Sequence, residues 1–167
     1  AEVLGMVSDV ITANARPEPA VTIEDLRIET LDEWVGASAS GWGISGADAV
    51  AQLRSDVERQ LRDEHDRLRL VLARCDGVPA GAGAVRYVRG GGYLIGCSVV
   101  PQFRRRGVYR SLVGYRLSLL RERGIPRVFT SAMVDTSAPI CARLGFRAVS
   151  RMTIYTSPSP ARSSSAD

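Results

Sequence analysis

Lysine is absent from this sequence of 167 residues, and all 22 basic residues are arginine. This absence excludes the lysine of a Walker phosphate-binding loop, a Schiff-base lysine and a pyridoxal phosphate anchor. Histidine occurs once, as His65, and the three cysteines, Cys75, Cys97 and Cys141, form no Cys-x-x-Cys pair. These residues give little support to a zinc site or a disulfide framework, so we expect no bound metal. We expect His65 to be solvated, because it lies near the end of a charged helical segment.

Long apolar runs are absent as well. No segment approaches the roughly 20 apolar residues that cross a bilayer, and residues 1–11 lack the basic start and apolar centre of a signal peptide. Hydrophobic residues make up 45% of the chain and charged residues 24%, a balance typical of one soluble globular domain. We therefore expect a cytoplasmic protein without a membrane partner.

Charge is divided unevenly along the chain. Residues 1–77 contain 8 arginines and 15 acids, a net charge of −7, whereas residues 78–167 contain 14 arginines and 3 acids, a net charge of +11. A half this basic attracts a polyanion, either a nucleic acid or a phosphorylated cofactor, and net charge alone does not distinguish the two. The acidic half favours a cationic partner.

The hydrophobic pattern predicts an α/β protein. Apolar residues at helical spacing predict a helix over residues 2–14, so residues 1–20 are expected to form an N-terminal arm or linker. The domain is expected over 21–156, and residues 157–167 are expected to be a disordered tail. Strands are expected over residues 21–29, 68–74, 80–88, 93–100, 128–133 and 147–156, and helices from Thr30 or Asp32 and over 48–66, 108–123 and 137–144. The small-residue stretch 36–46 is either a mobile lid or an ordinary loop.

A basic loop follows the strand predicted over residues 93–100. Three arginines, residues 104–106, come directly before Gly107, and the next helix begins at about Val108. A strand that runs into a glycine loop and a helix N-terminus presents free backbone N–H groups and a positive dipole end, which is the geometry that holds phosphate. No acid occurs between residues 76 and 122, so the site is expected to hold at least a diphosphate. The alternative is a solvated basic turn.

The segment from Ser98 to Leu112 resembles the coenzyme A motif of the GNAT superfamily of acyl-CoA-dependent N-acyltransferases. That motif is Arg or Gln, two residues, Gly, one residue, then Gly or Ala, placed after a valine-rich strand. Arg104 and Gly107 match it, whereas Tyr109 departs from it in the last small position. Residues 137–146 resemble the closing helix of the family, which ends in a basic residue, one further residue and Gly-Phe.

The resemblance implies a fold and a cofactor. The fold is of the α/β class (α+β type), with a mixed, mostly antiparallel central sheet that is splayed at the cofactor strand and flanked by helices. The cofactor is acetyl-CoA, whose pantetheine arm bonds to the strand like an added strand and whose pyrophosphate is held by backbone amides. The residues implied to bind it are Ser98, Val99, Val100, Arg104, Arg105, Arg106, Gly107, Val108, Tyr109 and Arg110.

The resemblance also implies direct attack of a primary amine on the thioester. Some members place a glutamate base where this sequence has Tyr93, so either Asp135 or Glu33 acts through water, or the acceptor needs little help. The family usually supplies a tyrosine proton donor from the closing helix, at the position of Cys141. That thiol either protonates the departing thiolate as a general acid or is a small buried core residue.

Three other functions stay open at this stage. The chain could be an acyl-CoA sensor without turnover, a basic nucleic-acid-binding module, or a domain of a larger enzyme in which residues 1–20 dock on a partner; a homodimer is also compatible. The acceptor is expected to be a small-molecule or peptide amine, and the acidic half favours a cationic one. Trp34 and Trp42 either line the acceptor pocket or pack in the core.

Overall fold

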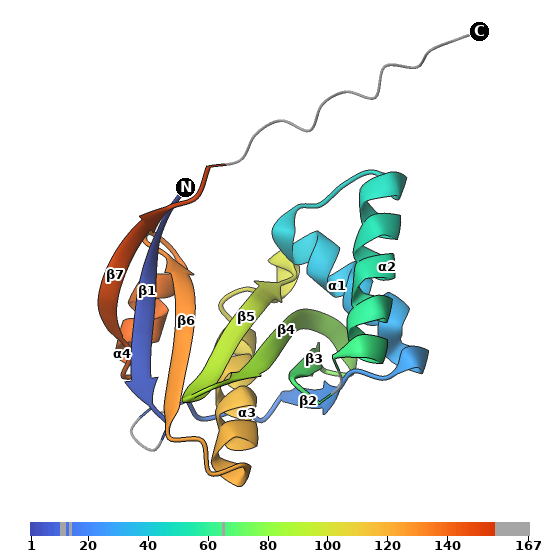
Figure 1. The fold of residues 1–167 in the computed structure, drawn as a ribbon. Helices are drawn as coiled ribbons and strands as arrows, with labels where there is room; N and C mark the ends of the chain where they lie inside the picture. Colours follow the sequence, from blue (N-terminus) through green and yellow to red (C-terminus); the bar gives the residue numbers. More distant parts are fainter. Residues whose placement is uncertain (11–12, 14, 65, 156–167) are drawn as a thin grey trace, which may run out of the picture.

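In a computed structural model, which describes residues 1–10, 13, 15–64 and 66–155, seven strands form one sheet in the order β2-β3-β4-β5-β6-β1-β7 (Figure 1). The strands are β1 (Glu2–Asp9), β2 (Val21–Asp25), β3 (Leu68–Cys75), β4 (Val78–Val88), β5 (Gly91–Val99), β6 (Arg127–Met133) and β7 (Arg147–Thr153). The helices are α1 (Leu31–Trp42), α2 (Ala47–Asp63), α3 (Val108–Glu122) and α4 (Ser137–Arg143), with short 3-10 turns at Ile28–Thr30 and Pro101–Phe103. Within the described residues, β5 and β6 are the only parallel neighbours, and the expected mixed, mostly antiparallel sheet is confirmed.

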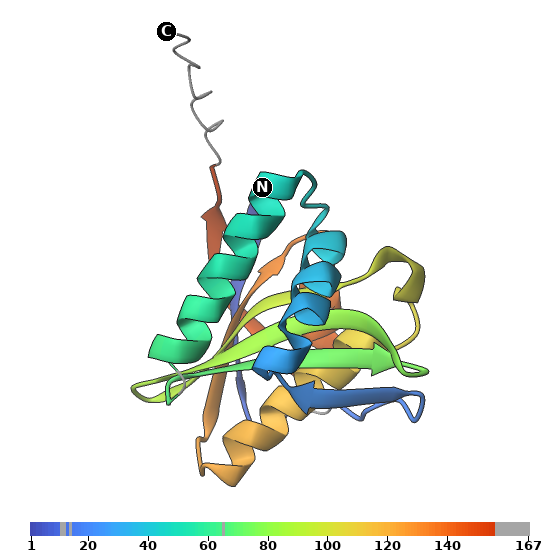
Figure 2. The same cartoon turned by 90° about the vertical axis from the view of Figure 1, so that its right-hand side faces the viewer.

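Helices cover both faces of this sheet. α1 and α2 lie on one face, and α3 and α4 lie on the other (Figures 1 and 2). The middle of β4 consists of glycine and alanine over residues 80–84, which lets helices approach it from both sides. A Cβ on Gly81 would lie 2.7 Å from the Ser98 carbonyl oxygen and 3.1 Å from Val108 Cγ1, so only glycine permits this close packing of β4, β5 and α3.

The N-terminal segment is a strand, and the helix predicted over residues 2–14 is wrong. β1 pairs antiparallel with both β6 and β7, so it lies inside the sheet. Val3 is buried on one face of the strand, and Met6 and Ser8 are buried on the other. A strand buried on both faces loses the alternation of apolar and polar residues, and its spacing then imitates a helix. The structure therefore adds these residues to the folded unit that we expected to begin at residue 21.

The stretch of small residues after Trp34 is mostly helical, so the loop or lid expected over residues 36–46 is wrong for its first part. α1 continues to Trp42 and packs against β4 and β5. A Cβ on Gly41 would lie 2.6 Å from Ser98 Cβ and 3.0 Å from the Val99 nitrogen. The small side chains therefore permit close contact between the helix and the sheet. The chain leaves the helix at Gly43, which has a left-handed φ of 69°.

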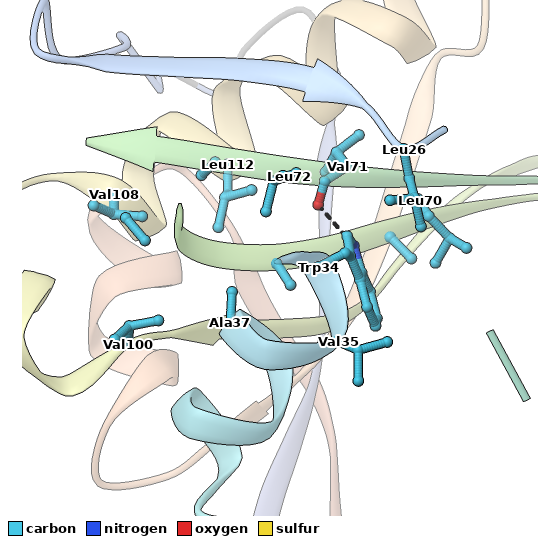
Figure 3. Close-up of a cluster of buried hydrophobic side chains, with 14 of the residues drawn as sticks. Leu26, Trp34, Val35, Ala37, Leu70, Val71, Leu72, Val100, Val108 and Leu112 are labelled. Carbon is cyan, nitrogen blue, oxygen red and sulfur yellow. Dashed lines mark hydrogen bonds between the residues drawn. The ribbon is translucent and has the colours of Figure 1, made fainter. Parts of the chain in front are cut away.

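Trp34 packs in the core rather than in a pocket. It is 5% exposed and lies among Leu70, Val71 and neighbouring apolar side chains (Figure 3). Its indole Nε1 donates a hydrogen bond of 3.0 Å to the Val71 carbonyl oxygen, so the polar edge of the ring is satisfied inside the protein. The core alternative for this tryptophan is therefore the one that the structure supports.

We expect Trp34→Phe to lower the free energy of unfolding by about 2 kcal/mol, because the Val71 carbonyl loses its donor and the smaller ring leaves a cavity. Urea unfolding followed by circular dichroism measures this. Trp42→Phe is the matched control: Trp42 is 54% exposed, so its free energy of unfolding should change by less than about 0.5 kcal/mol. Equal losses in the two variants would contradict the assigned core role.

Two sequence predictions, solvated His65 and a disordered tail over residues 157–167, lie outside the described residues. Within the described part of the chain, no helix has both the length and the apolar character of a membrane span.

Candidate functional site

The parallel strands β5 and β6 diverge along their length (Figure 1). Their pairing is confined to residues 92–94 opposite residues 128–130, and at its end the Thr130 hydroxyl donates to the Leu94 carbonyl at 3.1 Å. β5 continues to Val99 with β4 as its strand partner, so among the described residues no strand faces its other edge over residues 95–99. An open strand edge of this kind can accept an extended ligand as an added strand.

The loop between β5 and α3 has an unusual backbone. Arg105 and Gly107 both adopt left-handed φ angles, of 63° and 76°. Left-handed residues within a turn direct neighbouring N–H groups into one concave surface, which binds anions. α3 begins at Val108, and its N-cap residue is Gly107, which has no side chain to cap the first N–H groups. The loop and the positive end of the α3 dipole thus form one cradle for an anion, which we call the anion cradle (residues 104–110).

A cavity of about 1390 Å³ opens beside the anion cradle. Nine of the ten residues predicted to bind the cofactor line it. The tenth, Val100, does not: it is buried in the core (Figure 3), and its N–H donates to the Ala80 carbonyl at 2.9 Å. The cavity also takes in Glu18, Trp42 and Asp135, which come from distant parts of the chain.

Two arginines of the anion cradle are paired with acids. Arg106 lies 2.6 Å from the Asp76 carboxylate, and Arg110 forms an ion pair with Glu18. The absence of acids between residues 76 and 122 of the sequence therefore does not make this region free of acids in space. Glu18 was not predicted for this site because it lies more than 80 residues before the loop in the sequence.

Tyr109, the residue that departs from the motif, points away from the loop. Its hydroxyl lies 3.3 Å from the Cys141 sulfur of α4, within hydrogen-bonding distance. Cys141 is 1% exposed and is not part of the cavity lining, whereas Tyr109 does line the cavity. Burial raises the pKa of Tyr109 well above its ordinary value, so its hydroxyl stays protonated.

A buried arginine bonds to the backbone of β4 and β5 near Tyr109 and Cys141. Arg116 of α3 is 1% exposed, and it donates to the carbonyl oxygens of Leu112 at 2.9 Å, Ala84 at 3.0 Å and Ile95 at 3.4 Å. Gly83 makes room for it, since a Cβ there would lie 3.3 Å from the guanidinium carbon. Arg116 was not among the residues predicted for the site, although its place four residues after Leu112 put it on the apolar face of the helix.

The two thiols near the cavity are neutral. Burial raises the pKa of Cys97 and of Cys141, and the nearby Arg116 charge opposes this rise in both. Both groups therefore remain thiols near pH 7, and neither has the thiolate character that a nucleophilic cysteine needs.

The acids proposed as bases from sequence differ in position. Asp135 lines the cavity. Glu33 does not, and its carboxylate accepts a hydrogen bond of 2.5 Å from Arg74, which lowers its pKa and makes it a weaker base. Tyr93, at the position of the family glutamate, shares a hydrogen bond of 2.8 Å with Ser131 where β5 and β6 diverge.

The family model described as "Acetyltransferase (GNAT) family" matches residues 28–146, which is more than half of the chain. The chain belongs to the GNAT acetyltransferase family. The part that matches the GNAT model contains α1, the diverging strands, the anion cradle and α4, and leaves out β1 and β7. No curated protein sequence matches the chain.

Solved structures of other proteins share this fold. A conserved protein of unknown function from Staphylococcus epidermidis ATCC 12228 is 12% identical with a TM-score of 0.76, over 90% of this chain and 58% of that one. A GCN5-related N-acetyltransferase from Sphaerobacter thermophilus is 19% identical with a TM-score of 0.70, over 90% and 49%. AAC(6')-Iy, solved with the bisubstrate analogue CoA-S-monomethyl-acetylneamine, is 25% identical with a TM-score of 0.66, over 83% and 99%. This chain thus spans about half of the first two proteins and nearly all of the third.

Proposed function

We propose that this chain is an N-acetyltransferase that moves the acetyl group of acetyl-CoA to a primary amine. The observation that carries the proposal is the anion cradle, with left-handed Arg105 and Gly107 at the N-terminus of α3, opening into a large cavity beside the free edge of β5. The complex of AAC(6')-Iy with a bisubstrate analogue of coenzyme A and an amine supports the same use of this fold.

The residues present fit coenzyme A. Backbone N–H groups of the anion cradle would hold the pyrophosphate, and Arg104 and Arg105 would add charge-assisted bonds. The free edge of β5 over residues 97–99 would bond the pantetheine arm. The Ser98 hydroxyl is buried without a hydrogen-bond partner within the described residues, and its residue lines the cavity, as expected for a polar group whose partner is a ligand.

Direct attack of the amine on the thioester is favoured over an acyl-cysteine route, because the thiols near the cavity are neutral. The amine nitrogen forms a bond to the acetyl carbonyl carbon, the carbon–sulfur bond breaks, and a proton lost by the amine is balanced by the proton that the sulfur gains. Cys97 and Cys141 are protonated, so an acyl-cysteine intermediate has no ready nucleophile here.

Tyr109 is the group that we assign to the departing sulfur. Tyr109 lines the cavity, and its hydroxyl, which stays protonated, lies 3.3 Å from the Cys141 sulfur. A hydroxyl at this place can donate a hydrogen bond to the sulfur as negative charge develops there. The buried Arg116 charge lowers the pKa of Tyr109 and so opposes the effect of burial. The same positive charge also favours the negative charge that develops on the sulfur. Cys141 then positions the donor, while its own role as general acid stays a prediction.

The acceptor is expected to be an amine that is mostly cationic at pH 7 but has a pKa low enough for a useful fraction to be neutral and reactive. Asp135 gives the cavity wall an acid that can attract such an amine and pass its proton to water. An amine with a pKa near 8 is neutral about one time in ten at pH 7, whereas a lysine-type amine is neutral only about once in 2,500. With no strong base at the position of Tyr93, the first kind suits this site better.

A thiol-release assay with acetyl-CoA and a panel of amines tests the proposal. We expect release with at least one aminoglycoside, polyamine or α-amino peptide, and none without an amine. If acetyl-CoA stabilised the protein against thermal unfolding but no amine were acetylated, the result would favour an acyl-CoA sensor over an enzyme. No thermal stabilisation by acetyl-CoA, together with salt-sensitive binding to DNA, would favour the nucleic-acid module instead.

A further inference from the structure

The anion cradle is already in contact with an anionic side chain of this chain. A segment before β2, residues 15–20, runs along the N-terminal half of α3. The Glu18 N–H donates to the Ser111 hydroxyl at 2.9 Å, and the Glu18 carboxylate pairs with Arg110. A Cβ built on Gly107 would overlap the Glu18 side chain and lie 3.0 Å from its Oε1. The carboxylate therefore lies directly over the glycine of the coenzyme A motif.

This segment is stiff and held at several points. Pro17 and Pro19 flank Glu18, and each fixes its own φ near −65° and restricts the residue before it. The Ala15 backbone packs against Gly114 one to two turns further along α3, where a Cβ would overlap the Ala15 carbonyl. The Glu18 carbonyl accepts from the Val21 N–H at 2.9 Å, at the start of β2. Such a segment presents its carboxylate with little loss of conformational entropy.

The Glu18 carboxylate occupies the same groups of the anion cradle that a pyrophosphate would bind. It lies at the positive end of the α3 dipole, neutralises Arg110 and covers Gly107, where the backbone must be approached closely. The Glu18 carboxylate and a pyrophosphate cannot both occupy the anion cradle, because they would overlap and their like charges repel each other.

We propose that Glu18 is an internal competitor, an autoinhibitory anion that acetyl-CoA must displace from the anion cradle together with residues 15–20. The inference rests on the proposed function, because coenzyme A is the ligand that it assigns to the cradle. Displacement frees Arg110 for the pyrophosphate, so binding of the coenzyme and release of the segment are one coupled event.

Affinity for coenzyme A, measured by titration calorimetry, tests the competition. We expect Glu18→Gln to bind coenzyme A about fivefold more tightly than the wild type, the size expected when a partly exposed ion pair no longer has to be broken. Asp76→Asn is the matched control: it also removes one negative charge and releases one loop arginine, Arg106, but Asp76 is not part of the cavity lining. We expect this control to change the dissociation constant by less than twofold. An equal gain in both variants, or no gain in Glu18→Gln, overturns the proposal.

Hydrogen exchange gives a second measurement that separates this proposal from the proposed function. Between residues 16 and 20, only Arg16, Glu18 and Ala20 carry an amide hydrogen. Coenzyme A should slow exchange over residues 104–110 and speed it over residues 16–20, because the bond from Glu18 to Ser111 is lost. Slower exchange at 104–110 without faster exchange at 16–20 would overturn only the internal competitor. No change at 104–110 would overturn the coenzyme site itself.

Discussion

Gly107→Glu should bind coenzyme A at least 100-fold more weakly than the wild type. The new side chain would stand in the anion cradle, where its Cβ overlaps the Glu18 side chain and its carboxylate repels a pyrophosphate. Gly107 also has a φ of 76°, a conformation that costs other residues about 1 kcal/mol or more. Titration calorimetry gives the affinity, and thermal unfolding reports how much of the effect is strain.

Gly90→Glu is the control for backbone strain. Gly90 also has a left-handed φ, of 83°, but a Cβ there would meet nothing within 4 Å, and the residue is not part of the cavity lining. It should lower the melting temperature to a similar degree or less and leave coenzyme affinity within twofold. If Gly107→Glu bound coenzyme A as the wild type does, the cradle would not be the pyrophosphate site.

Tyr109→Phe should lower kcat about 100-fold while leaving the affinity for acetyl-CoA nearly unchanged. The ring still fills its place, so the variant loses only the hydroxyl that we assign to the developing charge on the sulfur. A hydrogen bond needed only as the thioester breaks acts on kcat rather than on the binding of the ground state. Steady-state kinetics with the best amine from the panel, together with calorimetry, separate the two effects.

Cys141→Ala distinguishes the donor from the group that positions it. If Tyr109 is the donor, this change removes a contact of 3.3 Å behind the hydroxyl and lowers kcat by only about three- to tenfold, with some loss of stability from the cavity that it leaves. If Cys141 is itself the general acid, the order reverses, and Cys141→Ala becomes the slower enzyme. Normal kcat in folded Tyr109→Phe would exclude the tyrosine.

Local features of this protein could be predicted from the sequence. The strand, arginine loop, glycine and amphipathic helix at residues 93–123 follow one another directly, so their order alone defines β5, the anion cradle and α3. The hairpin of β3 and β4 follows equally from its Asp76-Gly77 turn. In both cases the elements that interact are neighbours in the chain.

Other features depend on contacts that a local pattern does not contain. β1 was predicted as a helix because burial on both faces removes the usual alternation of a strand. α1 was predicted to begin at Thr30 or Asp32, but its second half was predicted as a loop because small residues that pack closely against the sheet are also typical of loops. The position of Glu18 over Gly107 and the contact of Tyr109 with Cys141 join segments 89 and 32 residues apart. The residue types were visible, but their partners are set by the path of the chain through space.

The place of β1 in the sheet bears on how this chain is made. About 120 residues separate Asp9 from its partner Arg127 in β6, and β7 lies later still. At roughly 5–20 residues per second, a ribosome needs about 6 to 24 s to make that interval. Until then β1 is an unpaired apolar strand outside the ribosome, and closing so long a loop carries a cost in entropy. The half of the sheet built from β6, β1 and β7 must therefore fold after synthesis of this region, and it is the half that depends most on protection from aggregation.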